Sequence, residues 1–333
     1  MDQAQLSLAH GFGPGISRSG ARRPFTYVDA AGDTISDPDV LSRIASLAIP
    51  PAWKDVWIAA DANSHLQATG IDGRGRKQYR YHPAWRHDRD ELKFIDMEAF
   101  GRAQPELRDR IALALTDEPE LSHRRVLALS LRLLDVGLFR VGSDRYARDN
   151  RHYGLTTLLS NQVAVRHEQA VFDYTGKAGR HQQLTITDPE AVAVLGPLRR
   201  RRTGPPELLA FRGSRGWTRI HSEDVNNFLR VEAAGPFSAK EYRTWNATVI
   251  AAVALATERP RTSRAPAVAS RAAAAALGNT PAVALRSYVD PRVLELYGAG
   301  KMVEAEAWAS DSWQARASDE IAVLELLSPG ANA

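Results

Sequence analysis

The spacing of apolar residues changes once along the chain, near residue 90. Four short segments before that point alternate and are separated by turn residues, as β-strands are: 26–28, 56–59, 65–68 and 78–82. After residue 94, apolar residues recur at helical spacing, as in Leu127, Leu131 and Leu134. We therefore predict an α+β protein. A small, mostly β N-terminal domain precedes a larger, mainly α-helical domain with a small antiparallel sheet over 163–188.

This change of pattern divides the 333 residues into three predicted parts. Residues 1–24 are rich in Gly and Ser and carry several arginines, so we expect a flexible basic arm. Residues 25–90 form the β-rich domain. Residues 91–333 form the C-terminal domain, for which we predict catalysis.

Composition excludes several kinds of chemistry. The chain has no cysteine, which rules out disulfides, thiolate catalysis and zinc–thiolate sites. The formal net charge is only +4, so the clustering of the basic residues is more informative than their excess. No long uncharged apolar run and no signal peptide is visible. We expect a cytoplasmic protein without a membrane partner.

Tyr288 lies at the predicted junction of two short helices. Thr280 suits the N-cap of the first helix and Pro281 its first position, where no backbone N–H is needed. Asp290 and Pro291 repeat this arrangement at the start of the second helix. A phenol at such a junction can point out of the core. An ordinary half-buried aromatic residue fits the same pattern.

Two cations lie in settings that are unusual for cations. Arg140 lies between Phe139 and Val141, and a buried guanidinium needs a partner. That partner is either a carboxylate such as Asp135 or a bound phosphate. Lys177 is at the tip of a predicted hairpin flanked by glycines, where it is either solvated or free to enter a groove.

Lys240 and Arg243 are three residues apart in a predicted helix and therefore share one face. Two neighbouring cations repel each other, so we expect an anion between them.

Residues 75–82 combine cations, an amide and phenols on one predicted strand. Alternation places Gln78, Arg80 and His82 on one face and Tyr79 and Tyr81 on the other. Such a ribbon suits phosphate contacts and the reading of base edges in a groove. A solvated edge strand with its aromatic side chains packed inward fits equally well. Residues 143–151 form a second basic patch that carries an aromatic residue.

The candidates for chemistry are Arg140, Lys177, Arg243, Asn279 and Tyr288. They lack a carboxylate cluster and a glycine-rich nucleotide motif, so we predict neither a metal nor a cofactor. A phenol with cationic and amide donors around it suits nucleophilic attack on a phosphodiester. A lysine on a mobile hairpin can protonate the leaving oxygen.

At these positions the chain resembles bacterial, poxvirus-like type IB DNA topoisomerases. The resemblance covers nearly the whole chain after the N-terminal arm and depends on the order and spacing of seven segments, each weak alone. These segments are 75–83 (GRKQYRYHP), 139–142 (FRVG), 153–158 (YGLTTL), 176–177 (GK), 222–226 (SEDVN), 239–245 (AKEYRTW) and 278–283 (GNTPAV).

The resemblance implies that Tyr288 attacks one strand of duplex DNA, forms a 3′-phosphotyrosyl bond and releases a 5′-hydroxyl, without ATP or metal. Arg140 and Arg243 would hold the scissile phosphate, and Lys177 would act as general acid. Asn279 stands where poxvirus relatives have histidine, which fits a hydrogen-bond donor. The family form is a monomer that closes as a clamp around DNA. The implied DNA contacts are Lys77, Gln78, Tyr79, Tyr81, Arg145, Tyr146 and Lys240.

Two other functions remain open on the sequence. A tyrosine recombinase or integrase shares this catalytic geometry, although such enzymes usually have histidine where Lys240 stands. A DNA-binding module without catalysis would not need all five candidates. Asp290 is a further departure, because many relatives carry histidine there; we expect this carboxylate to cap the second short helix.

Overall fold

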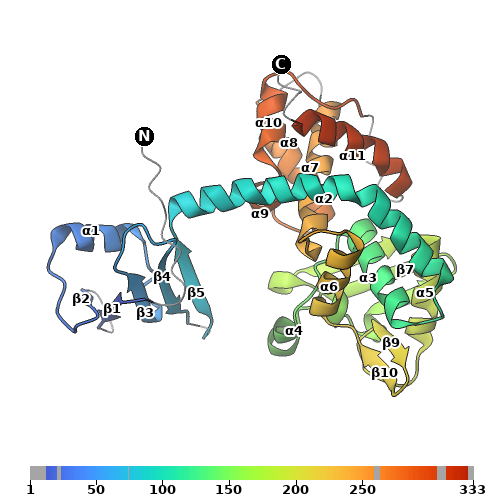
Figure 1. The fold of residues 1–333 in the computed structure, drawn as a ribbon, viewed down its shortest axis with the longest axis horizontal. Coiled ribbons are helices and arrows are strands. Elements are labelled where there is room, and N and C mark those ends of the chain that lie inside the picture. Colours follow the sequence, from blue (N-terminus) through green and yellow to red (C-terminus); the bar gives the residue numbers. More distant parts are fainter. Residues whose placement is uncertain (1–12, 21–23, 74, 259–262, 306–312, 329–333) are drawn as a thin grey trace. The chain divides into compact units, whose positions relative to one another are not determined.

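The computed structural model describes residues 13–20, 24–73, 75–258, 263–305 and 313–328 (Figure 1). The chain forms two compact units, residues 1–93 and 94–333, which we call the N-terminal unit and the C-terminal unit. Each is described by itself. In the described residues, no helix is both long enough and apolar enough to cross a membrane.

The N-terminal unit is an antiparallel five-stranded sheet with one helix. The strand order is β2-β1-β3-β4-β5. The strands are β1 (Gly15–Ser19), β2 (Thr26–Val28), β3 (Lys54–Ala59), β4 (Leu66–Ile71) and β5 (Lys77–Tyr81), and the helix is α1 (Pro38–Ser46). Asp37 caps α1 by accepting the N–H of Asp39. Ile44 of this helix joins the small core that includes Ile16 and Ile58.

The prediction of a flexible arm is wrong for its described part, because β1 lies inside the sheet and pairs with both β2 and β3. Gly15 fits against an aromatic ring: a Cβ at this position would lie 2.0 Å from Nε1 of Trp57. Ile16 is buried, and the Arg18 guanidinium donates to the carbonyl of Trp53 at 2.5 Å. Glycine and arginine here serve packing and hydrogen bonding. The remaining residues predicted as arm, 1–12 and 21–23, lie outside the described residues.

The C-terminal unit is mainly helical. It contains most of α2 (Pro83–Asp117), then α3 (His123–Gly137) and α4 (Asp144–Asn150), followed by a three-stranded antiparallel sheet. That sheet has the order β6 (Val163–Arg166), β7 (Gln169–Thr175) and β8 (His181–Ile186). The later elements are α5 (Pro189–Arg200), the hairpin β9 (Ala210–Gly213) and β10 (Gly216–Arg219), α6 (Ser222–Glu232), α7 (Ala239–Thr257), α8 (Ala265–Leu277), α9 (Pro281–Tyr288), α10 (Pro291–Gly298) and α11 (Trp313–Leu327). Helices with small antiparallel sheets agree with the predicted α+β class.

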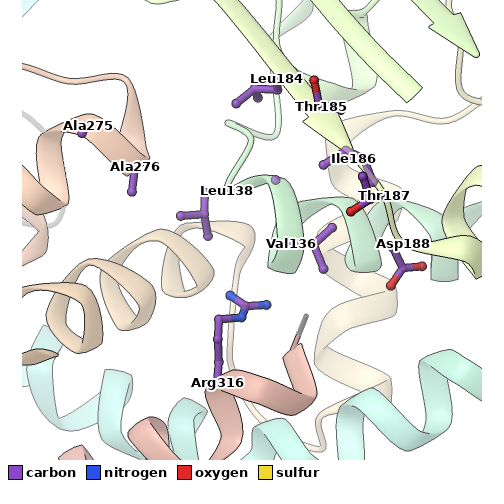
Figure 2. Close-up of a pocket in the computed structure, with 11 residues that line it drawn as sticks. Val136, Leu138, Leu184, Thr185, Ile186, Thr187, Asp188, Ala275, Ala276 and Arg316 are labelled. Carbon is purple, nitrogen blue, oxygen red and sulfur yellow. The ribbon is translucent and has the colours of Figure 1, made fainter. Parts of the chain in front are cut away.

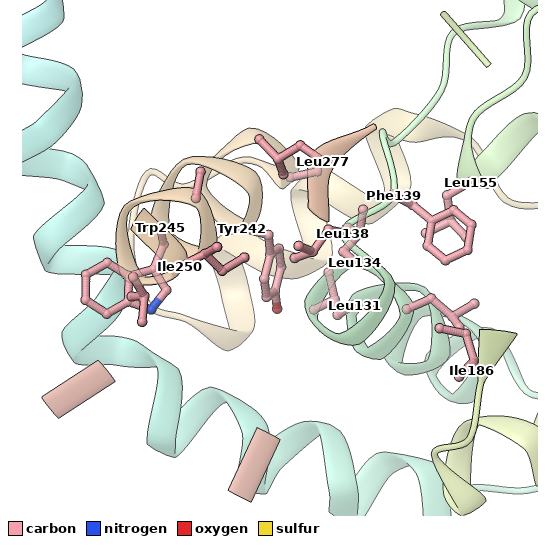
Figure 3. Close-up of a cluster of buried hydrophobic side chains, with 14 of the residues drawn as sticks. Leu131, Leu134, Leu138, Phe139, Leu155, Ile186, Tyr242, Trp245, Ile250 and Leu277 are labelled. Atoms are coloured by element: carbon pink, nitrogen blue, oxygen red, sulfur yellow. The ribbon is translucent and has the colours of Figure 1, made fainter. Parts of the chain in front are cut away.

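The core of the C-terminal unit is built around α7, which is buried along most of its length. Figure 3 shows this core continuing from Trp245 and Tyr242 of α7 to Leu131 and Leu134 of α3. Trp245 is fully buried and packs against Gly101 of α2, where a Cβ would approach the indole ring to 2.9 Å. Because α7 is fixed from several sides, a side chain that it carries is held in a constant place.

A buried network of charges connects α11 to the core. Arg108 of α2 donates to Asp135 of α3 at 2.8 Å and to Glu320 of α11 at 2.7 Å. Arg316 of α11 donates to Asn246 of α7 at 2.8 Å and to Asp135 at 3.3 Å. Burial acts to raise the pKa of Asp135, but the charges of Arg108 and Arg316 outweigh it and lower that pKa to about 2. Asp135 is thus ionised and fully paired.

Candidate active site

Tyr288 is the last residue of α9 and is half-buried. Thr280 caps α9 by accepting the N–H of Val283 at 3.3 Å, and Pro281 is its first residue, as predicted. The hydroxyl of Thr248, on α7, donates to the Tyr288 carbonyl at 3.3 Å and accepts the Asp290 N–H at 3.1 Å. A threonine in the core therefore fixes the backbone on both sides of the junction.

Asp290 is the N-cap of α10, as predicted, and accepts the N–H of Arg292 at 2.9 Å. Its carboxylate is fully buried and forms an ion pair with the Arg292 guanidinium. The negative charge of Asp290, close to Tyr288 in sequence, is therefore neutralised by Arg292 of α10.

Arg243 lies on α7 and is only 4% exposed. It donates to the carbonyl of Leu138, at the end of α3, and at 2.9 Å to that of Leu277, at the end of α8. Its guanidinium carbon lies 5.3 Å from the centroid of the Tyr288 ring. Two carbonyls from distant segments thus hold one cation over the phenol. A guanidinium has five N–H groups, and the Nε of Arg243 is buried without a hydrogen-bond partner among the described residues, so it can donate to a bound anion.

Arg140 is directed toward the same place by an unusual backbone path. Leu138 has a φ of +49°, a left-handed conformation that turns the chain out of α3. The Arg140 carbonyl then accepts the N–H of Leu155 at 2.8 Å. Gly142 has a φ of +104°, and a Cβ on Gly154 would lie 2.6 Å from its Cα. The two segments can pair this closely only because both positions are glycine.

The Arg140 guanidinium donates to the side-chain Oδ1 of Asn279. The prediction that Asp135 is the partner of Arg140 is therefore wrong, because the Asp135 carboxylate binds Arg108 and Arg316. The Nδ2 of Asn279 is buried and has no hydrogen-bond partner among the described residues. Such an amide is a donor that lacks an acceptor, as a residue awaiting an anion would be.

Lys177 lies in the turn between β7 and β8, as predicted, and is exposed. The turn closes where the N–H of Gly176 donates to the carbonyl of Arg180 at 2.7 Å. It holds Ala178 at a φ of +63° and Gly179 at +73°, both left-handed. From this turn the charge of Lys177 acts on the Tyr288 phenol.

The Tyr288 phenol is surrounded by cations. Burial acts to raise its pKa, but the charge and hydrogen bond of Arg243 and the charges of Arg140 and Lys177 outweigh burial and lower the pKa below its ordinary value. In turn, burial and the neighbouring Arg140 lower the pKa of Arg243 to about 10. Three of the other four predicted side chains therefore act on the Tyr288 hydroxyl, and the fourth, Asn279, is linked to them through Arg140. This arrangement favours a phenolate and can bind a phosphate.

Lys240 and Arg243 do not form the expected pair. Lys240 is exposed, whereas Arg243 is buried against backbone carbonyls. The prediction of an anion between them is therefore not supported, because Lys240 in the first turn of α7 is at the surface and Arg243, three residues later, is in the core. A DNA contact by Lys240 stays a prediction.

The predicted DNA contacts of the N-terminal unit lie on β5, an edge strand of the sheet. Tyr79 is 45% exposed, and its ring stacks on that of Tyr81 at 6.2 Å between centroids. Arg80 points to the other face, where it donates to the Ala48 carbonyl at 3.1 Å. The alternative in which the aromatic residues pack inward is wrong, at least for Tyr79.

The remaining predicted contacts are at or near the surface. On β5, Lys77 is exposed, and Gln78 donates to Asp72 at 2.9 Å. On α4, Tyr146 is 48% exposed, and Arg145 lies within 3.6 Å of Asp149. The contacts of these residues with DNA stay predictions.

The sequence analysis missed two residues beside the site. Thr248 lies five residues after Arg243, a spacing that gives no local signal. Tyr174 of β7 is buried and stacks on Phe139 at 6.1 Å between centroids. Burial raises its pKa to about 12 against the charges of Arg243 and Arg140. Tyr174 therefore stays protonated beside the arginines. Because residues two apart on a strand share a face, its spacing from the apolar Phe172 could have indicated that Tyr174 is buried.

Comparison with known proteins agrees with this geometry. Residues 24–72 match the model of the bacterial DNA topoisomerase IB N-terminal domain, and residues 82–305 match that of the eukaryotic DNA topoisomerase I catalytic core. The chain is 30% identical over 291 residues to a protein named DNA topoisomerase 1B from Acanthamoeba polyphaga mimivirus, covering 84% of this chain and 86% of that protein. The resemblance seen in the sequence is thereby confirmed, and the chain belongs to the type IB DNA topoisomerase family.

Proposed function

We propose that this topoisomerase relaxes supercoiled duplex DNA through a covalent bond between Tyr288 and the 3′ end of one cut strand. The Tyr288 oxygen attacks the phosphorus, the bond from phosphorus to the 5′ oxygen breaks, and the leaving oxygen takes a proton. The supporting observation is the position of Arg243 over the Tyr288 ring, with Arg140 and Lys177 acting on the same phenol.

Each of the other candidates has a role that suits its surroundings. Arg140 and Arg243 would bind the nonbridging oxygens and the charge that develops on them in the transition state. Asn279 would donate its Nδ2, which has no acceptor among the described residues. Lys177, on the exposed turn, would give its proton to the 5′ oxygen.

The reverse reaction restores the DNA. The 5′-hydroxyl attacks the phosphotyrosine, and the strand is rejoined after the free end has rotated about the intact strand. Because the phosphotyrosyl bond conserves the energy of the broken bond, the cycle balances without ATP. No metal is assigned a role.

The DNA contacts would lie on both units. We assign Lys77, Gln78, Tyr79 and Tyr81 to the N-terminal unit, and Arg145, Tyr146 and Lys240 to the C-terminal unit. We further propose that a monomer closes around the duplex as a clamp and acts at the nucleoid. The exposure of Tyr79 and Tyr146 supports these contacts.

Relaxation of a plasmid without ATP or magnesium tests this function. The wild-type chain should relax the plasmid, and Tyr288→Phe should not. Relaxation by the Tyr288→Phe variant would refute the role of Tyr288. Recombination of two plasmids instead of relaxation would support the recombinase, and retention of DNA with unchanged supercoiling would support a binding module.

A further inference from the structure

One side chain contacts two glycines that directly precede candidate catalytic residues. Gly176 precedes Lys177, and a Cβ added to it would lie 3.0 Å from Cγ of Gln182. Gly278 precedes Asn279, and a Cβ there would lie 2.2 Å from Oε1 of Gln182. The stem of Gln182 therefore passes Gly176, and its tip reaches Gly278. A side chain at either glycine would compete with Gln182 for this space.

The conformation of Gln182 is fixed by its own strand. Gln182 lies on β8 opposite Tyr174 of β7, immediately below the turn that carries Lys177. Its Nε2 donates to the carbonyl of His181 at 2.9 Å. The side chain is half-buried. The side chain is thus oriented by the β7–β8 hairpin, and its contact with Gly278 fixes the hairpin relative to that glycine.

The contact at Gly278 is at the turn that positions Asn279. Gly278 ends α8 with a φ of +59°, and the N–H of Asn279 donates to the Ala274 carbonyl at 3.0 Å. This path brings Asn279 to Arg140. Gln182 therefore connects the turn that carries Lys177 with the turn that carries Asn279.

Beyond Gln182, the boundary between β8 and α8 is hollow. A cavity of about 210 Å³ separates Leu184 and Ile186 of β8 from Ala275 and Ala276 of α8 (Figure 2). Direct packing between the strand and the helix is interrupted there. Gln182, two residues before Leu184, contacts Gly278 at the end of α8 and so connects the strand to the helix.

We propose that Gln182 is a positioning residue that holds the Lys177 turn against the Asn279 turn. This inference rests on the proposed function, because it concerns the delivery of the Lys177 proton to the 5′ oxygen. Without the Gln182 side chain, the hairpin is free to shift relative to the phosphate site. A displacement of the catalytic group by about 1 Å, caused by a change away from the reacting atoms, can cost roughly 100-fold in rate.

Single-turnover cleavage with two suicide substrates tests this proposal. One is ordinary DNA, and the other has sulfur in place of the 5′ bridging oxygen, so that its leaving group needs no proton. Gln182→Ala should slow cleavage of ordinary DNA by roughly 10- to 100-fold. It should cleave the sulfur substrate at nearly the wild-type rate. Gln182→Met, which retains the length of the stem, should restore most of the loss on ordinary DNA.

Three outcomes of these measurements would overturn the role of Gln182, and a double variant provides a fourth. These are a wild-type rate on ordinary DNA, equal slowing on both substrates, and a loss in Gln182→Met as large as in Gln182→Ala. The double variant Gln182→Ala/Lys177→Ala should cleave ordinary DNA as fast as Lys177→Ala alone. A rate lower by the product of the two single losses would also contradict the proposal. If wild type forms no adduct, the proposed function itself fails. If wild type depends on Lys177 but not on Gln182, only this inference fails.

Discussion

The candidate active site and strand β5 both present polar and aromatic groups, but the protein holds them in different ways. Arg243 is 4% exposed and is fixed by two carbonyls, whereas Tyr79 on β5 is 45% exposed and its ring stacks on that of Tyr81. Groups that stabilise a transition state must be fixed before the reaction, because reorganising them raises the barrier. Groups that contact the DNA surface share their energy among many contacts. Substitutions in the two regions should therefore differ in kind.

The largest expected effect comes from Tyr288→Phe. This change removes the attacking oxygen, so covalent adducts should fall below detection while DNA affinity stays nearly unchanged. One hydroxyl contributes little beside many phosphate contacts. Adduct formation on a suicide substrate measures the activity, and fluorescence anisotropy measures the DNA affinity separately. A loss of affinity as large as the loss of activity would remove the distinction between the regions.

Lys177→Ala should have the next largest effect. General acid catalysis typically contributes about 10²- to 10⁴-fold, so cleavage of ordinary DNA should slow by that order. Cleavage of DNA with a 5′ bridging sulfur should slow far less, because its leaving group needs no proton. Rapid-quench measurements on both substrates test this. Equal slowing of the two would exclude Lys177 as the acid.

The same variant should also shift the pH dependence of cleavage. The charge of Lys177 lowers the pKa of Tyr288, so its removal should raise that pKa. In the proposed mechanism Tyr288 attacks as the phenolate, and the fraction of phenolate rises as the pH approaches the pKa of Tyr288. The rising part of the pH profile should therefore move to higher pH in Lys177→Ala. The single-turnover cleavage rate at subsaturating DNA, which reports the free enzyme, should be measured with the sulfur substrate.

Lys54→Ala provides a control for this shift, since Lys54 is an exposed lysine on β3 of the N-terminal unit. Its removal should leave the pH profile in place. An unchanged profile in Lys177→Ala would mean that the lysine does not act on the phenol.

The smallest effect is expected on β5. Lys77→Ala should reduce the slope of log affinity against log salt by about one. The cleavage rate at saturating DNA should not change, because no group that contacts the scissile phosphate is altered. Titrations at several salt concentrations test the first expectation. A slower cleavage step at saturation would show that β5 also affects catalysis.

The sequence was sufficient where a local pattern determines the structure. The caps at Thr280 and Asp290 and the turn at Lys177 follow from residue types at fixed spacing, and the structure contains all three. The resemblance to a family added the expectation that distant residues converge. Arg140, Arg243 and Tyr288 do converge, although their catalytic roles stay a prediction.

The features that the sequence could not provide depend on contacts between distant segments. Arg18 and Gly15 appear to belong to a flexible arm until the carbonyl of Trp53 and the ring of Trp57 are in place. The same holds for Gln182, whose partners at positions 176 and 278 are far apart in the chain. Local composition could not show that these glycines allow close packing against another segment, because the same residue type is also common in flexible segments.

The covalent residue can be identified directly. Trypsin should release residues 287–292, a peptide that contains a single tyrosine, Tyr288. After cleavage of a suicide substrate and digestion of the DNA with nuclease, mass spectrometry should find this peptide with a nucleotide attached through its 3′ phosphate. Wild-type adduct on any other peptide, or attached through a 5′ phosphate, would contradict attack by Tyr288.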